Sequence, residues 1–410
     1  MAGYTVAIAG LLGSTAAARA ADPSAHDAPR VLFNTGPTLR PANRAATDGQ
    51  AVARGALARS GPDCIKQAYQ RSQSAQTPAD YTSVVTLCQE GIALGVTEET
   101  RTYARQLLSW AHNRRGEAAA AAGQDAEALR DFDTAVQYDK TRWRALHNRG
   151  VSRALAGQYA EAIADFSRTI ELNPQFANAY FNRAEMRYEL GQFAAAIEDY
   201  TRALQLAPDD SAAQNSRGHA YFQLGAYRAA ISDFTAALAI SPDNAAALTN
   251  RGDVLAELGY YAEALRDYHQ SLSIDKRLGR THQSIAWLVA TCPDETYRDA
   301  QLALSAARRA IELDGDSSPR YLDTLAAAYA EAGNFREAQQ AMQQAIDMAP
   351  EQAPEHYRKR LALYAQARPY RSVPKQVAAP PVAATSPPPS GRKTVQSAAH
   401  AVPDRTRPRR

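Results

Sequence analysis

The residues best suited to chemistry in this chain are arginines and aspartates that recur at a fixed interval of 34 residues. The five arginines are Arg115, Arg149, Arg183, Arg217 and Arg251, and the five aspartates are Asp131, Asp165, Asp199, Asp233 and Asp267. A guanidinium and a carboxylate can form two parallel charge-assisted hydrogen bonds, so the pattern predicts five structural ion pairs. The alternative is that the arginines form a ladder that binds anions. Regularly spaced charges more often belong to the scaffold, and we favour the ion pairs.

The elements that would position these pairs are two helices joined by a sharp turn. Each arginine and its aspartate lie eight residues on either side of one glycine, namely Gly123, Gly157, Gly191, Gly225 and Gly259. Glycine makes such a turn at low steric cost. In an antiparallel hairpin both partners then stand at one height, about 12 Å from the turn at about 1.5 Å per residue. We therefore expect each pair to join the two helices of one hairpin.

Small and aromatic residues predict close packing inside each hairpin. The five 34-residue units begin at Ser109, Trp143, Ala177, Ser211 and Ala245. Small residues fill the eighth place (Gly116, Gly150, Ala184, Gly218, Gly252) and the twentieth place (Ala128, Ala162, Ala196, Ala230, Ala264). The twenty-fourth place is aromatic: Phe132, Phe166, Tyr200, Phe234 and Tyr268. A large ring beside small residues indicates core packing rather than a cofactor pocket.

This pattern resembles the tetratricopeptide repeat family, in the variant whose first helix carries Asn-Arg-Gly, as at 148–150. The resemblance spans 109–278 and implies an all-α fold, a right-handed superhelical solenoid of about seven to eight helical hairpins. A later unit, 319–352, keeps the small and turn positions but has Leu325 and Ala341 in place of the ion pair. The segments AWLVATCPD and YLDTLAAAYAEAG resemble a C-terminal element of some bacterial members.

The remaining segments are predicted to be caps and arms. We expect residues 61–108 to form a degenerate helical hairpin at the N-terminal end, residues 279–318 a longer divergent hairpin, and residues 353–370 a capping helix. Residues 21–60 and 371–410 are rich in proline, alanine and polar groups. Such segments bury too little apolar surface to fold, so we expect disordered arms.

The resemblance implies that a partner binds the concave face, which the first helices of successive repeats line. Their second, sixth, ninth and thirteenth places form one stripe by helical spacing. The candidate partner-binding residues on this stripe are Asn148, Asn182, Asn250, Glu185, His219 and Asp253. By the same resemblance, an asparagine ladder can hold a peptide main chain, since an amide both donates and accepts hydrogen bonds. The alternative is that asparagine is merely tolerated on a solvated face.

Compact catalytic and metal-binding motifs are missing from the sequence, which has no Walker loop, dinucleotide fingerprint, serine elbow, HExxH or paired CxxC. The solenoid also uses nearly all the foldable length. We therefore expect a non-enzymatic scaffold or adaptor that needs no cofactor or metal and binds a protein or peptide. The alternative is a structural spacer that is anchored to an anionic surface or polymer by its proline-rich tail.

Charge is unevenly distributed along the chain. Residues 371–410 carry eight basic side chains and one acidic, whereas residues 61–370 have a net charge of −7. The basic tail could contact nucleic acid, but no aromatic residues are interleaved for base stacking. We therefore do not expect nucleic-acid binding.

The N-terminus and the cysteines bear on the compartment. Residues 1–20 hold a short apolar run and an Ala-Arg-Ala suited to cleavage after Ala20, which predicts a secretory signal peptide and a periplasmic or secreted protein. The alternative is an alanine-rich leader on a cytoplasmic protein. An exported chain could bridge Cys64 and Cys88, whereas Cys292 is expected to be a packed thiol. Beyond the leader, no run approaches the ~20 apolar residues of a membrane-spanning helix.

Overall fold

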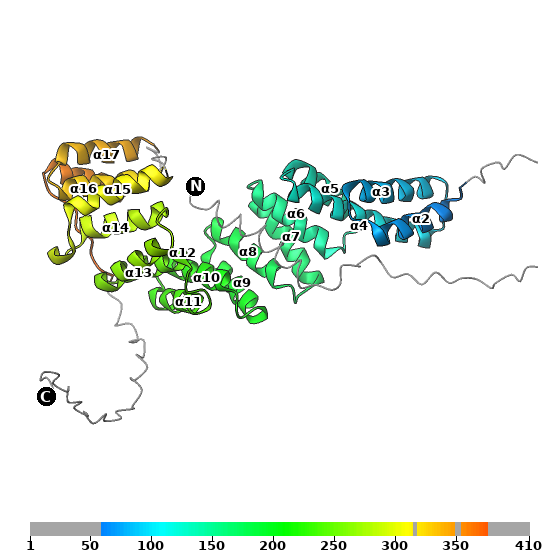
Figure 1. Ribbon diagram of the computed structural model, residues 1–410, viewed down its shortest axis with the longest axis horizontal. Coiled ribbons are helices and arrows are strands. Elements are labelled where there is room, and N and C mark those ends of the chain that lie inside the picture. The colour runs from blue at the N-terminus through cyan, green and yellow to red at the C-terminus, as the bar shows by residue number, and fades with distance from the viewer. Residues whose placement is uncertain (1–58, 315–317, 349–353, 376–410) are drawn as a thin grey trace, which may run out of the picture.

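The computed structural model describes residues 59–314, 318–348 and 354–375, and within these ranges all regular structure is helical. In these described ranges, seventeen α-helices follow one another as eight antiparallel pairs and one final helix (Figure 1). The pairs are α2 (Gly61–Ser74) with α3 (Pro78–Ala93), α4 (Glu98–Ala121) with α5 (Asp125–Tyr138), α6 (Trp143–Leu155) with α7 (Tyr159–Leu172), α8 (Ala177–Glu189) with α9 (Phe193–Leu206), α10 (Ser211–Gln223) with α11 (Tyr227–Ile240), α12 (Ala245–Glu257) with α13 (Tyr261–Ile274), α14 (Gly279–Thr291) with α15 (Ala300–Asp314), and α16 (Pro319–Glu331) with α17 (Phe335–Asp347). The final helix is α18 (Glu355–Ala365). The predicted all-α solenoid of hairpins is confirmed.

Each regular hairpin turns at the predicted glycine, whose backbone lies in the left-handed region. The φ angle is 75° at Gly157 and 78° at Gly333, values that cost other residues free energy. The amide of Gly157 donates to the carbonyl of Ala154 at 3.0 Å, and that of Gln158 donates to the carbonyl of Arg153 at 2.9 Å. These bonds satisfy carbonyls that the end of a helix leaves without a partner.

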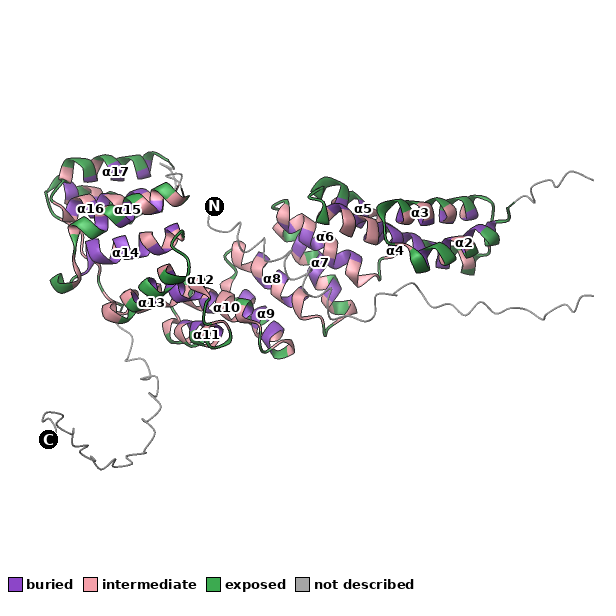
Figure 2. Ribbon diagram, viewed as in Figure 1, coloured by how far each residue is buried: buried purple, intermediate pink, exposed green. Residues whose placement is uncertain are grey.

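The small residues bring the two helices of a hairpin together, as the spacing predicts. A Cβ atom added to Gly150 would lie 2.7 Å from the ring of Phe166, so the ring rests directly on the helix backbone. Both Phe166 and Ala162 have no exposed surface. Figure 2 shows the buried residues on the faces where helices meet, with exposed residues along the outer faces of α3 and α17.

The N-terminal end differs from the prediction in one boundary. Helix α4 begins at Glu98, well before the first regular unit, so residues 61–108 contain α2, α3 and the first part of α4. The side chain of Thr97 caps this helix by accepting from the amide of Thr100 at 3.3 Å. Tyr103 and Leu107 continue the buried face of α4 toward the first hairpin.

The first hairpin also corrects the prediction of a disulfide. Cys64 and Cys88 lie on its two helices, as expected, but both are free thiols with no exposed surface. Burial raises the pKa of Cys88 to about 12, so this thiol is not ionised near neutral pH. The two sulfurs pack in the apolar core at this end of the solenoid.

The C-terminal arm was predicted to be disordered from residue 371, and this is wrong for residues 371–375. They form an extended segment, here called the strap, that crosses the ends of α14 and α12. The amide of Ser372 donates to the carbonyl of Thr291 at 2.8 Å, and that of Lys375 donates to the carbonyl of Glu257 at 2.7 Å. Composition does not reveal such main-chain bonds. The predicted signal peptide and the rest of both predicted arms lie outside the described residues.

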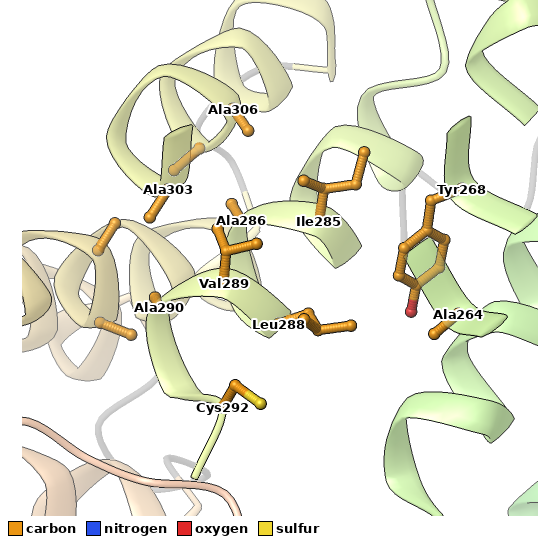
Figure 3. Close-up of a cluster of buried hydrophobic side chains, with 13 residues drawn as sticks. Ala264, Tyr268, Ile285, Ala286, Leu288, Val289, Ala290, Cys292, Ala303 and Ala306 are labelled. Carbon is orange, nitrogen blue, oxygen red and sulfur yellow. The ribbon is translucent and has the colours of Figure 1, made fainter. Parts of the chain in front are cut away.

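In the divergent unit, α14 and α15 form a hairpin, with a short 3-10 helix at Glu295–Tyr297 in its long loop. Figure 3 shows the buried apolar cluster that ties it to the preceding repeat, with Tyr268 on one side and Ile285 and Val289 on the other. Cys292 joins this cluster and is 1% exposed, so it is the packed thiol that the sequence predicts. Among the described helices, none is both long and apolar enough to cross a membrane.

Candidate partner-binding groove

All five arginine and aspartate pairs are formed inside their hairpins. Each arginine donates from Nε and from one Nη to the two carboxylate oxygens of its aspartate, over distances of 2.6 to 2.9 Å. The aspartates are at most 9% exposed. Such buried bidentate pairs fix the first helix of a hairpin against the second.

The remaining guanidinium nitrogen of each arginine reaches the preceding hairpin. Arg183 donates from Nη1 to Ser167 at 3.0 Å, and Arg217 donates to Thr201 at 3.0 Å. Arg149 reaches Asp133 in the same way, at 3.1 Å. Because these nitrogens are already engaged within the solenoid, the arginines are placed as structural links rather than as a ladder for anions.

The asparagines of the predicted ladder also bond within the solenoid. Asn148 donates from Nδ2 to Asn113 at 3.0 Å, and Asn250 donates to Asn215 at 3.0 Å. Asn182 is 4% exposed and offers little surface to a partner. Consecutive first helices lie so close together that these amides meet each other across the repeats. The structure therefore gives these amides a structural role between repeats, and their binding of a partner stays a prediction.

The two predicted acidic residues are engaged with tyrosines. Glu185 accepts a hydrogen bond from Tyr200 at 2.6 Å, and burial raises its pKa. Asp253 accepts from Tyr268 at 3.0 Å and from Arg280 at 2.8 Å. Burial opposes the ionisation of Asp253, but the neighbouring arginines hold its pKa below the usual value.

A groove with a cavity of about 430 Å³ opens among the first helices of the C-terminal half. Its walls come from α10, α12, α13, α14, α16, α18 and the strap. Of the six predicted binding residues, His219 and Asp253 line this groove. The other four lie on first helices but not on its walls.

The predicted stripe continues into this groove, beyond the residues that the sequence analysis assigned to it. In the unit that starts at Gly279, the second, sixth, ninth and thirteenth places all line the cavity; they are Arg280, Ser284, Trp287 and Thr291. Arg320 and Thr324 occupy the second and sixth places of the next unit and line it as well. The helical spacing that defines the stripe is also present in these two later units, beyond the five regular repeats.

His219 forms an uncharged aromatic surface at one wall of the groove. Its ring stacks on Tyr188 and Phe222, with ring centroids 5.3 and 6.4 Å away, and its Nδ1 lies 3.0 Å from the hydroxyl oxygen of Tyr188. Burial lowers the pKa of His219 to about 4, so the imidazole is neutral near neutral pH.

Another wall of the groove is built around an ion pair between α16 and α18. Arg360 donates to Asp323 at 2.7 Å, and both residues are 5% exposed. The guanidinium carbon of Arg360 also lies 5.0 Å from the ring centroid of Trp287 and 5.0 Å from that of Tyr370. Burial raises the pKa of Asp323 to about 6. This cluster holds α14, α16, α18 and the approach to the strap together.

The groove also contains a thiol and several titratable side chains. Its thiol, Cys292, has a pKa that burial raises, which disfavours the nucleophilic thiolate. In the part of the chain that the structure describes, no group of three or more His, Cys, Asp or Glu side chains could hold a metal ion.

Comparison with known families supports the repeat assignment. Tetratricopeptide repeat models match residues 143–176, 245–278 and 319–352, and a related TPR repeat model matches 184–225 and 218–259. The chain is a tetratricopeptide repeat protein. No curated protein matches it in sequence.

Solved structures of other proteins are similar to parts of this chain. One from Parabacteroides merdae has 18% identity and a TM-score of 0.51, over 63% of this chain and 98% of that one. The APC/C hetero-tetramer Cut9-Hcn1 has 15% identity and a TM-score of 0.52, over 70% of this chain and 52% of the other. A third, YrrB, is described as a TPR protein with an unusual peptide-binding site; it has 20% identity and a TM-score of 0.39, over 42% of this chain and 89% of YrrB.

The groove combines matched tetratricopeptide repeats with segments outside the family matches. Helices α10, α12 and α16 lie within matched residues, whereas α14, α18 and the strap do not. The elements that distinguish this groove from the surface of a regular repeat therefore come from the divergent C-terminal region.

Proposed function

We propose that this tetratricopeptide repeat protein is a non-enzymatic scaffold whose groove binds an extended segment of a partner protein. The observation that carries the proposal is the strap. A stretch of extended polypeptide already docks at the edge of the groove through main-chain hydrogen bonds, and Ser372, Val373 and Pro374 line the cavity. A surface that holds its own extended segment in this way has the geometry that a partner segment requires.

The chemistry of the walls supports a peptide as the ligand. Trp287 and Phe222 provide aromatic surface, which contributes strongly to protein interfaces. Gln223 and Arg320 are exposed polar residues that line the same cavity. A mixture of aromatic area and a few polar groups suits a protein segment, which has apolar side chains and a polar main chain.

The test is affinity capture with the full chain as bait and two charge-reversal variants. Arg320→Glu changes an exposed groove residue, whereas Arg266→Glu changes an arginine of α13 whose side chain is 74% exposed and lies outside the groove. We expect the wild type and Arg266→Glu to retain a partner that Arg320→Glu loses. Equal retention by both variants would contradict binding in the groove.

The same experiment addresses the compartment and the alternative function. Capture from separated cytoplasmic and envelope extracts tests the proposal of export, because an exported protein finds its partner in the envelope fraction. Deletion of residues 376–410 leaves the strap in place and removes most of the basic tail. Loss of all association on this deletion would favour the spacer anchored by its tail.

A further inference from the structure

The strap contacts two successive repeats at equivalent positions. Its acceptors, the carbonyls of Thr291 and Glu257, each belong to the thirteenth place of a first helix. Its donors, the amides of Ser372 and Lys375, stand three residues apart. The strap therefore advances by three residues for each repeat that it crosses.

This register has a physical basis in the helix ends. The last carbonyls of a helix have no partner inside the helix and carry a partial negative charge. Three extended residues span about 10 Å, which matches the spacing of about 8 to 10 Å between packed helices. An extended chain that crosses the first helices thus meets one free carbonyl at every third residue.

Two basic side chains of the strap lie near acidic groups at the ends of α16 and α12. Arg371 donates to the carbonyl of Ala290 at 3.2 Å, and its Nη1 lies 2.7 Å from a carboxylate oxygen of Glu331. Lys375 follows four residues later, at the C-terminal end of α12. Burial raises the pKa of Glu257, and the positive charge of Lys375 opposes that rise. Cations are favoured at the negative ends of helices.

The strap fills this surface with little apolar burial. Val373, in its middle, is 78% exposed. Pro374 lies beside the turn at Gly259, where a Cβ atom added to the glycine would be 3.4 Å from the proline ring. Its main-chain bonds and its ion pair between Arg371 and Glu331 are contacts that a second extended chain with the same donors can make in its place.

The row of thirteenth-place carbonyls is longer than the strap. Gln223 of α10 and Glu189 of α8 occupy the same place, and in the described residues no backbone amide donates to their carbonyls. In the sequence, the next members of the series 372, 375 are 378 and 381, and Pro381 has no amide hydrogen to donate. A partner segment free of this proline can reach more carbonyls than the strap.

We propose that the carbonyls of Thr291 and Glu257, together with the carboxylates of Glu331 and Glu257, form a docking edge for an extended basic segment of a partner protein. The strap occupies this edge until the partner displaces it. The partner segment carries basic residues four apart and amide donors three apart, as the strap does. This inference rests on the proposed function and names the partner chemistry that the edge of the groove recognises.

The test uses a fluorescent synthetic peptide that copies residues 368–378, measured by anisotropy against the full chain. In the variant Ser372→Pro/Lys375→Pro, the strap lacks both amide donors. Val373→Pro is the matched control, since the amide of Val373 donates no hydrogen bond among the described residues. We expect the peptide to bind the double variant roughly tenfold more tightly than the wild type, because the internal competitor is gone. Val373→Pro should resemble the wild type.

A second peptide, with proline at the positions of Ser372 and Lys375, tests the register without altering the protein. It should show no binding. Equal affinity of the first peptide for the wild type and the double variant would overturn the inference, as would binding of the proline peptide.

The captured partner separates this inference from the proposed function. A partner that Arg320→Glu loses, but that binds the wild type and the strap variant equally, upholds the groove and overturns the role of the strap. If Arg320→Glu does not weaken the binding of the partner, the proposed function is contradicted. The peptide measurements then test the docking edge by themselves.

Discussion

The regular hairpins, 109–278, and the C-terminal region, 279–375, bury charged residues in different ways. In the regular part the same pair recurs in each hairpin, and each arginine also reaches the hairpin before it. In the last repeat Leu325 and Ala341 replace that pair. Its buried carboxylate, Asp323, instead pairs with Arg360 of α18.

This difference in the ion pairs shows how one part of a solenoid comes to contain a groove that the regular repeats lack. A repeated ion pair gives each hairpin the same neighbours and leaves the first helices closely packed, with Asn148 and Asn250 bonded across repeats. A single ion pair at the end gathers α14, α16 and α18 around aromatic rings and leaves a groove beside them. The regular repeats form the scaffold, and the divergent C-terminal region forms the groove.

The sharpest test of this comparison is the substitution Arg360→Leu. It leaves Asp323 buried without its cation and removes the contacts of the guanidinium with Trp287 and Tyr370. We expect a loss of about 4 kcal/mol in the stability of the C-terminal region. Hydrogen exchange of α16 and α18 measures it. The double variant Asp323→Leu/Arg360→Leu should recover much of the loss, and a single variant as stable as the wild type would contradict the role of the pair.

The ion pairs of the regular hairpins should differ in how much stability is lost when the arginine is replaced. The structure shows one arginine on Asp233 but two on Asp199, where Arg187 adds a contact of 2.7 Å to that of Arg183. Arg217→Leu should therefore cost about 3 kcal/mol, and Arg183→Leu about 1 kcal/mol, since Asp199 keeps a cation. Urea unfolding followed by circular dichroism measures both. Equal costs would show that the second arginine contributes nothing.

A buried histidine makes the regular part sensitive to acid. His147 is 4% exposed, and burial lowers its pKa to about 4 from the ordinary value of 6.5. Between these values the unfolded chain binds a proton and the folded chain does not, so its contribution to stability is lost as the pH falls. The loss is about 1.4 kcal/mol per pH unit. His147→Phe, which copies Phe181 of the next repeat, should remove this part of the pH dependence in unfolding measured from pH 7 to 4.

The smallest expected effect concerns the asparagines. Asn250→Ala removes one hydrogen bond between repeats and should cost about 1 kcal/mol. It should leave partner binding unchanged, in contrast to Arg320→Glu. If Asn250→Ala is fully folded by circular dichroism but loses the partner, then Asn250 contributes directly to partner binding.

Much of the regular part follows from local rules. The turn at Gly157, the ring of Phe166 against Gly150 and the pair of Arg149 with Asp165 all join residues within one hairpin. Helical geometry converts such short spacings into positions on known faces, and the fivefold repetition removes chance agreement. These features were accordingly predicted without a structure.

The groove depends on contacts between residues far apart in the chain. Arg360 and Asp323 are 37 residues apart, and Ser372 bonds to Thr291 over 81 residues. No periodic pattern encodes these pairings, because each occurs once. For the same reason the proline-rich composition beyond residue 370 concealed the strap, and the spacing of Cys64 and Cys88 did not reveal that both remain free thiols.

The sequence by itself determined the repeat, its turns and its ion pairs, because these depend on spacings within 34 residues. Only the tertiary structure decided where the groove lies. It engages the asparagines between repeats, and it opens a groove where the repeats diverge. It also lays the strap across the carbonyl ends of α14 and α12, since unpaired helix carbonyls attract an extended chain wherever the fold brings one within reach.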